Sequence, residues 1–297
     1  MRFSLNRKES VEALRKKIDQ LDGKIVELLN ERASLAQKIG HTKSQGKEQV
    51  YVPSREKEIL ERVSSLNRGP LSKHAVHSIY REVLSASRSL EAPVKIAYLG
   101  PEATFTHMAA RERFGSSANF VSLASIADIF TEVSQGRADY GVVPIENSTE
   151  GVVTHTLDML VETDVKICAE VSLEIHLFLL SRSGRLDDVE CILSHPQALA
   201  QCRRWLASHC PRLRIDEVAS TAQAAQRAAQ DKTLAAIASG LAKDFYGLEV
   251  AGENIEDHAN NMTRFLTDPS KSSARSWNGR RDPRPEGARF CSTRSQA

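Results

Sequence analysis

The sequence predicts an all-helical N-terminal segment that is followed by an α/β domain. Apolar side chains recur at intervals of three and four residues across 8–43, the spacing of a helix that packs along one face. After Ala92-Pro93 the pattern changes, and short β-rich runs alternate with helical stretches, as in α/β proteins. The chain has 297 residues, enough for two domains that each bury a hydrophobic core.

The first helix is expected to pair with a second copy of the chain. Its apolar positions alternate three and four residues apart, as in the seam of a coiled coil. A helix over 8–43 is roughly 54 Å long at about 1.5 Å per residue, longer than the rest of the segment 8–91 can cover. The seam residues are Val11, Leu14, Ile18, Leu21, Ile25, Leu28, Leu35 and Ile39.

Two shorter helices complete the segment 8–91. Pro53 suits the first turn of the second helix, and residues 67–70 (Asn-Arg-Gly-Pro) break the chain after it. A third helix is expected to run to about Glu91. The inward-facing positions are Ile59, Val63 and Leu66 in the second helix and Val76, Ile79, Tyr80, Val83 and Leu84 in the third.

The remainder of the chain is expected to hold the strands of the α/β domain. Each β-rich run is short, and polar turns separate it from the next helical stretch. The expected strands lie within 94–99, 140–145, 165–180, 190–193, 213–218 and 234–238, and two of the expected helices cover 198–206 and 222–229.

Charge and cysteine content argue against several classes of protein. Forty basic and 38 acidic side chains give a net charge of +2, which does not favour binding to nucleic acid or to a membrane. The N-terminus has no apolar run typical of a secretory signal, and no run is long enough to span a bilayer. The five cysteines form no Cys-x-x-Cys pair, so we expect reduced thiols in a cytoplasmic protein and no metal site.

Residues 269–297 are expected to form a disordered basic tail. Seven basic and two acidic side chains lie within 270–297, and the stretch is rich in Ser, Arg, Gly and Pro. It shows no apolar period, so it offers too little apolar surface to fold.

A cation interrupts the seam of the first helix. Counting forward from Leu28, the next core position is Arg32. A guanidinium that faces a helical core is costly unless it meets an anion, and the alternative is that Arg32 reaches the surface. Lys43 lies about three turns further along the same face, whereas Arg15 faces a different side and suits the pocket of a partner chain. These positions predict a pocket for a small dianion.

Residues 8–91 resemble the all-helical chorismate mutase domain. The likeness rests on 14–19 (Leu-Arg-Lys-Lys-Ile-Asp), 29–32 (Leu-Asn-Glu-Arg), Lys43 and 53–56 (Pro-Ser-Arg-Glu), while Val52 departs from the Asp of some members. It implies an intertwined dimer that rearranges chorismate to prephenate without a cofactor, with Lys43 and Glu91 as catalytic residues. The substrate-binding residues that it implies are the partner's Arg15, Arg32, Lys43, Arg55, Glu56, Ser87 and Glu91.

Three segments with hydroxyl side chains precede expected helices of the α/β domain. Each of 100–106, 194–197 and 220–221 would place a hydroxyl at a helix N-terminus, where free backbone N–H groups attract anions. Each alone is an ordinary helix cap. The three together with the polar turn 146–149 (Glu-Asn-Ser-Thr) favour a cleft that binds carboxylates, and 260–265 adds a hydroxyl and a cation.

Four of these segments together resemble prephenate dehydratase. They are 100–105 (Gly-Pro-Glu-Ala-Thr-Phe), 143–148 (Val-Pro-Ile-Glu-Asn-Ser), 194–197 (Ser-His-Pro-Gln) and 263–265 (Thr-Arg-Phe), with Ala103 where the common form has Gly. The likeness implies a domain 94–268 with its site between two α/β lobes, 94–171 plus 249–268 and 172–248.

In that family prephenate loses carbon dioxide and hydroxide to give phenylpyruvate. Thr263 matches the catalytic threonine, which donates a hydrogen bond or a proton to the departing hydroxyl. Arg264 either holds a carboxylate or forms a structural ion pair, and His107 is expected to face solvent. The remaining substrate-binding residues that we expect are Thr104, Asn147, Ser148, Ser194 and Gln201.

The two parts together resemble the bifunctional chorismate mutase–prephenate dehydratases of phenylalanine biosynthesis. The expected partners are chorismate, prephenate and a second copy of the chain, without cofactor, metal, nucleic acid or membrane. Two alternatives stay open: an active mutase with an impaired dehydratase, and a two-lobed ligand sensor without turnover. A helix that only dimerises has no use for inward cations such as Arg32, which argues against the sensor.

Phenylalanine is expected to inhibit this chain weakly or not at all. Family members of this type usually continue into an ACT regulatory domain with a Gly-Ala-Leu turn and a Glu-Ser-Arg-Pro motif, and neither occurs in the 297 residues. Both activities of the purified chain should therefore stay close to their starting values when phenylalanine is titrated in. Strong inhibition of either activity would contradict this expectation.

Overall fold

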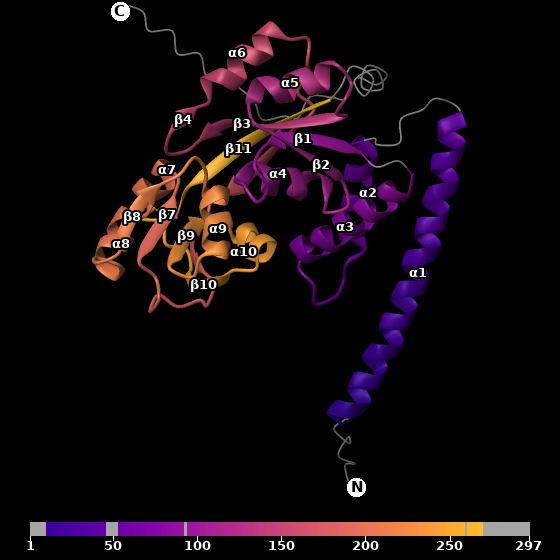
Figure 1. Cartoon of the computed structure of the whole chain (residues 1–297). Helices are drawn as coiled ribbons and strands as arrows, with labels where there is room; N and C mark the ends of the chain where they lie inside the picture. Colours follow the sequence, from indigo (N-terminus) through magenta and orange to yellow (C-terminus); the bar gives the residue numbers. More distant parts are fainter. Residues whose placement is uncertain (1–9, 46–52, 92–93, 259, 270–297) are drawn as a thin grey trace, which may run out of the picture.

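The computed structural model describes residues 10–45, 53–91, 94–258 and 260–269 (Figure 1). It confirms the predicted order, with a three-helix segment followed by an α/β domain that contains two sheets. The predicted tail lies outside the described residues, except for its first residue. Within the described ranges, no helix combines the length and the apolar character that a membrane crossing requires.

The helical segment consists of α1 (Val11–Gln45), α2 (Pro53–Leu66) and α3 (Lys73–Glu91). Figure 1 shows α1 as a long helix along the outside of the molecule, with α2 and α3 between it and the α/β domain. The seam of α1 remains uncovered within one chain, since Ile18, Leu21 and Leu28 are 55%, 56% and 64% exposed.

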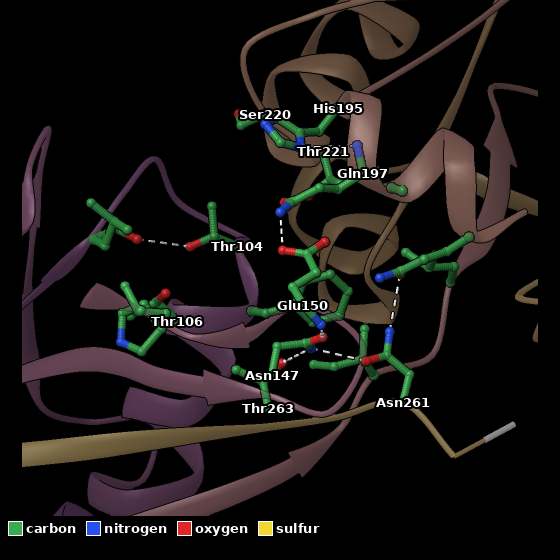
Figure 2. Close-up of a pocket in the computed structure, with 18 of the residues that line it drawn as sticks. Thr104, Thr106, Asn147, Glu150, His195, Gln197, Ser220, Thr221, Asn261 and Thr263 are labelled. Carbon is green, nitrogen blue, oxygen red and sulfur yellow. Dashed lines mark hydrogen bonds between the residues drawn. The ribbon is translucent and has the colours of Figure 1, made fainter. Parts of the chain in front are cut away.

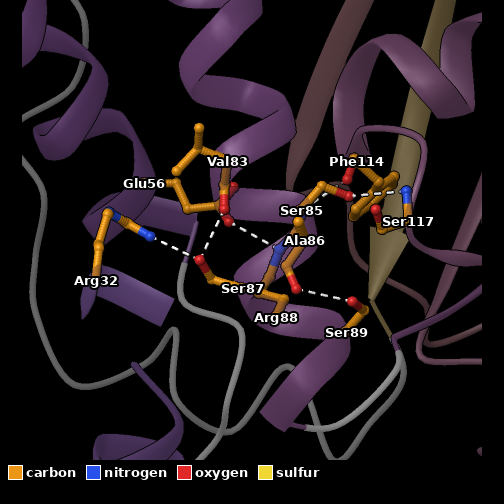
Figure 3. Close-up of polar contacts among 10 residues, drawn as sticks. All are labelled: Arg32, Glu56, Val83, Ser85, Ala86, Ser87, Arg88, Ser89, Phe114 and Ser117. Atoms are coloured by element: carbon orange, nitrogen blue, oxygen red, sulfur yellow. Dashed lines mark hydrogen bonds and ion pairs between the residues drawn. The ribbon is translucent and has the colours of Figure 1, made fainter. Parts of the chain in front are cut away.

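A buried arginine joins α3 to the α/β domain (Figure 3). Arg88 is 8% exposed, and its Nη2 donates to the carbonyl oxygen of Phe114, the last residue of α4 (Phe105–Phe114), at 2.5 Å. Its Nε lies 3.0 Å from Oε1 of Glu56 on α2. Ser85 Oγ accepts the Ser117 N–H at 3.1 Å. The polar side chains of α3 are therefore buried because the helix docks against the end of α4.

The first sheet has the strand order β2-β1-β3-β11-β5, with β4 also paired to β3. Strands β1, β2 and β3 are parallel, and β11 runs antiparallel between β3 and β5. Helix α4 covers one face, while α5 and α6 cover the other. The elements are β1 (Lys95–Leu99), β2 (Asn119–Leu123), α5 (Ile126–Ser134), β3 (Tyr140–Asn147), β4 (Gly151–Val152), α6 (Thr154–Glu162), β5 (Ala169–Glu174) and β11 (Met262–Pro269).

Alternating side chains on each strand build a core on both faces of this sheet. Tyr98 and Phe265 lie in the cluster on the α4 face, and their neighbours Ala97 and Leu266 lie in the cluster on the α5 face. Both faces of β1 and of the first half of β3 are therefore apolar. This is why the sequence shows short continuous apolar runs in these two strands, whereas β5 alternates apolar and polar residues.

The second sheet has the strand order β10-β6-β9-β7-β8. Strands β8 and β9 flank β7 in parallel, while β6 runs antiparallel to β9 and β10 antiparallel to β6. Figure 1 shows α9 and α10 on one side of it and α7 and α8 on the other. The elements are β6 (Phe178–Ser181), β7 (Cys191–Ser194), α7 (Pro196–Gln201), α8 (Arg203–His209), β8 (Arg214–Glu217), α9 (Thr221–Gln230), β9 (Leu234–Ala238), α10 (Gly240–Tyr246) and β10 (Glu249–Gly252).

The lobes differ from the expected division at β5 and β10. The second lobe was expected to begin at residue 172, but β5 pairs with β11 as far as Glu174 and so belongs to the first sheet. The sequence expectation gave 249–252 to the first lobe, but β10 pairs with β6 and so belongs to the second sheet. Gly247, in the left-handed region at φ +65°, ends α10 and precedes β10, which runs along the edge of β6. Strands β2, β4, β10 and β11 were not among the expected strands, and the run 165–180 splits into β5 and β6.

The expected helix 198–206 is divided at Cys202 into α7 and α8. The carboxylate of Asp257 accepts the N–H groups of Arg204 at 2.9 Å and Trp205 at 3.1 Å, so it caps α8. The Asp257 N–H donates to the Gln201 carbonyl oxygen at 2.7 Å. Asp257, about fifty positions along the chain, therefore binds both the end of α7 and the start of α8.

Two neighbouring segments connect the lobes. The N–H of Ile175 donates to the carbonyl oxygen of Asn261 at 2.7 Å, and the N–H of Ile255 donates to that of Leu177 at 2.9 Å. Glu256, whose side chain is 4% exposed, also accepts the Leu177 N–H at 2.9 Å. The chain thus passes from the first lobe to the second and back through two segments that are hydrogen-bonded to each other.

A buried histidine shapes the turn before α4. His107 is 4% exposed, so the expectation that it faces solvent was wrong. Its Nδ1 accepts the Ala103 N–H at 3.0 Å, and its ring stacks on Tyr98 with centroids 4.6 Å apart. Ala103 has φ +63°, a conformation that suits glycine. Burial lowers the pKa of His107 to about 4, which keeps Nδ1 available as an acceptor.

The α/β domain should lose stability as His107 becomes protonated in the unfolded chain. Because the folded pKa of about 4 lies below the ordinary 6.5, the contribution is present above pH 6.5 and is lost as pH falls toward 4. His107→Gln keeps an acceptor but does not titrate, so its unfolding free energy should lose on the order of 2 kcal/mol less across this range. Urea unfolding at several pH values measures this, and equal pH dependence in both proteins would contradict it.

Candidate active site

A cavity of about 380 Å³ lies between the two lobes (Figure 2). The ends of strands and the N-termini of helices from both lobes surround it. Part of its lining is apolar and includes Phe105, Leu177 and Phe265. The polar lining residues are Thr104, Thr106, Asn147, Glu150, His195, Gln197, Gln201, Ser220, Thr221, Asn261 and Thr263.

The pairing of β11 with β3 brings two of the predicted site residues together. Thr263 and Asn147 are directly opposite each other in the antiparallel ladder, so their side chains share one face. Asn147 Nδ2 donates to Thr263 Oγ1 at 2.7 Å. Thr263 is 9% exposed, at the wall of the cavity. Because its oxygen already accepts from Asn147, its own O–H is directed elsewhere.

A chain of side-chain amides extends from Thr263 along the cavity wall (Figure 2). Asn147 Oδ1 accepts the backbone N–H groups of Thr149 and Glu150, at 2.9 and 3.2 Å. Asn147 Nδ2 also donates to Asn261 Oδ1 at 2.9 Å, and Asn261 Nδ2 donates to Gln201 Oε1 at 3.0 Å. Asn147 and Gln201 were expected at the site.

Asn261 is a lining residue that the sequence did not single out. It lies in the polar stretch 260–265, in which no spacing distinguishes it from its neighbour Asn260. In the structure Asn261 is 4% exposed and Asn260 is exposed. Asn261 is buried and Asn260 is exposed because the chain passes back from the second lobe to the first at this point. A single sequence does not show where such a connection packs.

Arg264 lies outside the cavity. It follows Thr263 on β11, so its side chain points to the opposite face of the sheet. Its Nη1 lies 2.6 Å from Glu146 Oε2 and its Nε lies 2.6 Å from Glu170 Oε1. The hydrogen bonds from Arg264 lower the pKa of Glu170. The structure thus favours the ion-pair alternative for Arg264 over a carboxylate-binding role.

Two of the three expected helix caps are present. Thr104 Oγ1 accepts the His107 N–H at the start of α4, and Ser220 Oγ accepts the Gln223 N–H at the start of α9. Both residues line the cavity, so two helix N-termini point toward it.

Ser194 is not a cap. It ends β7, is fully buried, and donates to the Ile237 carbonyl oxygen at 2.6 Å. His195 caps α7 instead, because its Nδ1 accepts the Gln197 N–H. Ser148 is exposed and is not a lining residue. It donates to the Asn260 carbonyl oxygen and accepts the Met262 N–H, so it ties β3 to the start of β11.

Exposed and buried contacts both cross the cleft. Glu150 follows β3 in the first lobe and accepts a hydrogen bond from Gln197 on α7 in the second (Figure 2). At another point Ser239 Oγ donates to the Ala103 carbonyl oxygen at 2.8 Å, and Ser239 is fully buried. The two lobes therefore contact each other just before the start of α4, at Ala103, as well as at Glu150 and Gln197.

The helical segment brings together some of its predicted residues. Arg32 Nη1 donates to Ser87 Oγ at 2.7 Å (Figure 3). One side of Gly40 faces Glu91, because a Cβ built there would lie 2.8 Å from Glu91 Cγ. The face of α1 that carries Arg32 therefore packs on the face of α3 that carries Ser87 and Glu91. The side chain of Lys43, on the same face of α1, lies outside the described residues.

The other predicted residues of the helical segment are further apart within one chain. Glu56 is held by Arg88, as described above. Arg55 pairs with Glu58 at 2.9 Å, and its side chain is 60% exposed. Arg15 is exposed on the N-terminal half of α1, away from Ser87. Among the described residues, no group of three or more His, Cys, Asp or Glu side chains is arranged to hold a metal ion.

Two family models match the chain, one for each part. The model for chorismate mutase type II matches residues 14–92, and the model for prephenate dehydratase matches residues 96–269. The boundary between the matches coincides with the change from helices to the α/β domain.

Curated relatives combine both parts. The bifunctional chorismate mutase/prephenate dehydratase of Aquifex aeolicus (strain VF5) is 49% identical over 262 residues, which are 87% of this chain and 72% of the relative. That of Pseudomonas aeruginosa is 45% identical over 264 residues, with the same coverage of each.

A solved structure is similar to the α/β domain. It is prephenate dehydratase from Arthrobacter aurescens in complex with L-Phe, which is 34% identical, with a TM-score of 0.55. The match covers 60% of this chain and 60% of that one. The matched models, the identity to relatives and the order of the two parts agree, and this chain belongs to the bifunctional chorismate mutase/prephenate dehydratase family.

Proposed function

We propose that this chain carries out two consecutive reactions of phenylalanine biosynthesis. The helical part rearranges chorismate to prephenate, and the α/β part converts prephenate to phenylpyruvate. The observation that carries the second activity is the Thr263 hydroxyl at the wall of the cavity between the lobes, with its oxygen bound by Asn147. We assign 8–91 to the mutase domain and 94–268 to the dehydratase domain.

The mutase reaction requires a site that holds a compact dianion and stabilises charge on the breaking ether bond. No nucleophile is needed, because the reaction is pericyclic: one bond forms and the ether bond breaks in a single concerted step through a cyclic transition state. Positioned cations lower such a barrier by orientation and by electrostatic stabilisation. The contact of Arg32 with Ser87 supports a pocket between α1 and α3. Lys43, Glu91, Arg55, Glu56 and the partner's Arg15 complete it in this proposal.

The dehydratase reaction breaks two bonds of prephenate. The electrons of the bond to the leaving carboxylate move into the ring, the ring becomes aromatic, and the hydroxyl departs with its bonding pair. The Thr263 O–H donates a hydrogen bond to the departing oxygen, and Asn147 orients that O–H by donating to Thr263 Oγ1. Gln201, Thr104 and the helix N-termini at the cavity bind the carboxylates.

We further propose that the chain forms a homodimer through α1. An isolated helix with a long exposed apolar seam is not stable in water, and a second copy of the same seam is its matched cover. The partner would also supply Arg15 to the mutase site.

We place the protein in the cytoplasm. Cys191, Cys202 and Cys210 are buried and form no disulfide bond, and Cys291 lies outside the described residues. Burial raises the pKa of Cys202 to about 12, so this thiol stays protonated and unreactive. Reduced, buried thiols are typical of that compartment.

Two alternatives to the bifunctional enzyme make different predictions for the same sample. An impaired dehydratase would accumulate prephenate from chorismate, and a ligand sensor would consume neither compound. The geometry at Thr263, with an oriented hydroxyl in the cavity between the lobes, supports an active dehydratase. A sensor requires only binding groups and has no need for an O–H held in this way.

The coupled reaction tests the proposal. Purified protein supplied with chorismate should consume it and release phenylpyruvate. Thr263→Val removes the hydroxyl at nearly constant volume, so we expect phenylpyruvate formation to fall at least about 100-fold. Chorismate loss should stay unchanged, which also shows that the protein is folded. Thr263→Ser should retain much of the activity, and full activity of Thr263→Val would contradict the assignment.

The dimer is tested on the seam of α1. Ile25 is 52% exposed, so Ile25→Lys should leave the single chain folded but place a charge in the proposed interface. We expect monomers in sedimentation, loss of mutase activity because the partner's Arg15 is absent, and retention of dehydratase activity. Glu27→Lys on the polar side of α1 is the matched control and should remain dimeric. A dimeric Ile25→Lys protein would contradict the interface.

A further inference from the structure

We infer that Asn261 is a positioning residue of the dehydratase, which orients Asn147 toward Thr263 and Gln201 toward the substrate. The inference rests on the proposed dehydratase function. Its basis is one buried amide that contacts two residues of the cavity wall and lies two positions before Thr263 on the chain.

The orientation of the amide chain follows from its fixed end. The backbone N–H groups of Thr149 and Glu150 both donate to Asn147, so the atom that accepts them is Oδ1 and the opposite atom is Nδ2. Asn147 Nδ2 carries two protons, which go to Asn261 Oδ1 and Thr263 Oγ1. An acceptor at position 261 therefore helps to hold the amide at the angle that reaches Thr263.

The same reasoning continues to Gln201. Asn261 uses its oxygen for Asn147, so its Nδ2 is the atom that faces Gln201, and it donates to Gln201 Oε1. The carbonyl end of Gln201 is thereby occupied, and its Nε2 protons are presented on the other side, where Gln201 lines the cavity. Asn261 thus turns Gln201 into a hydrogen-bond donor toward a bound anion.

Burial gives this arrangement its energetic weight. Asn261 is 4% exposed, and a buried amide without partners would be strongly unfavourable. Its backbone is also fixed, because its carbonyl oxygen accepts the Ile175 N–H at 2.7 Å in the connection between the lobes. The Asn261 amide is therefore held in a fixed position, and its two hydrogen bonds restrict the orientations of the Asn147 and Gln201 side chains.

Two substitutions separate the two contacts. Asn261→Asp keeps an acceptor for Asn147 but loses the donor to Gln201. We expect kcat for prephenate within about threefold of the wild type and KM raised about tenfold. Asn261→Leu loses both contacts at similar volume, and we expect kcat to fall about 100-fold. Asn260→Leu changes the exposed neighbour and should leave both constants unchanged.

A double substitution distinguishes positioning from a general structural role. If Asn261→Asp acts through Gln201, then adding Gln201→Leu to it should raise KM no further than Gln201→Leu alone. A structural defect would instead give effects that multiply. Multiplying effects, or a kcat in Asn261→Leu within twofold of the wild type, would overturn the inference. So would equal losses of kcat in the Asp and Leu variants.

Failure of the proposed function is recognised separately. It would appear as a wild-type chain that does not convert prephenate at all. Calorimetric binding of prephenate to the wild type and to Asn261→Asp then decides the positioning role. A tenfold weaker affinity in the variant supports the inference, and equal affinities overturn it.

Discussion

The site of the α/β domain depends on the register of β11 against β3. Thr263 is opposite Asn147 and Arg264 is opposite Glu146 in this ladder. The first pair faces the cavity with a hydrogen bond of 2.7 Å, and the second forms an ion pair on the other face. A shift by one residue would exchange the two faces and put the guanidinium in the cavity. The ion pair and the apolar neighbours Phe265 and Leu266, one in the core on each face, therefore hold the register that the site requires.

The elements that local sequence patterns control were predicted well. The helix α1, the strands β1, β3 and β9, and the caps of α4 and α9 all follow from periodicity or from a hydroxyl residue at a helix start. Ser194 shows the limit of this reasoning. It has the residue type of a cap, but it sits one position too early, inside a buried strand, and His195 provides the cap. Sequence spacing alone does not distinguish these two positions.

The features that were missed depend on contacts between distant segments. His107 is buried because Tyr98, Phe120 and Phe245 surround its ring, and these residues come from β1, β2 and α10. Arg88 acquires its partners from α2 and from the end of α4, so only the docking of the helical segment explains an arginine that is 8% exposed. In the sequence Asn261 is an ordinary polar loop residue. Its buried contacts arise only because β11 pairs with β3 and β5 in the first sheet. Family resemblance supplied the site residues that pattern alone would not have ranked.

The contacts across the cleft differ in how easily they can open. The two connecting segments are joined by backbone hydrogen bonds, and Ser239 holds Ala103 in a fully buried position. The contact between Glu150 and Gln197 lies between two exposed side chains. Water competes with an exposed hydrogen bond far more effectively than with a buried one. The Glu150 edge is therefore the side of the cleft at which separating the two lobes costs the least free energy.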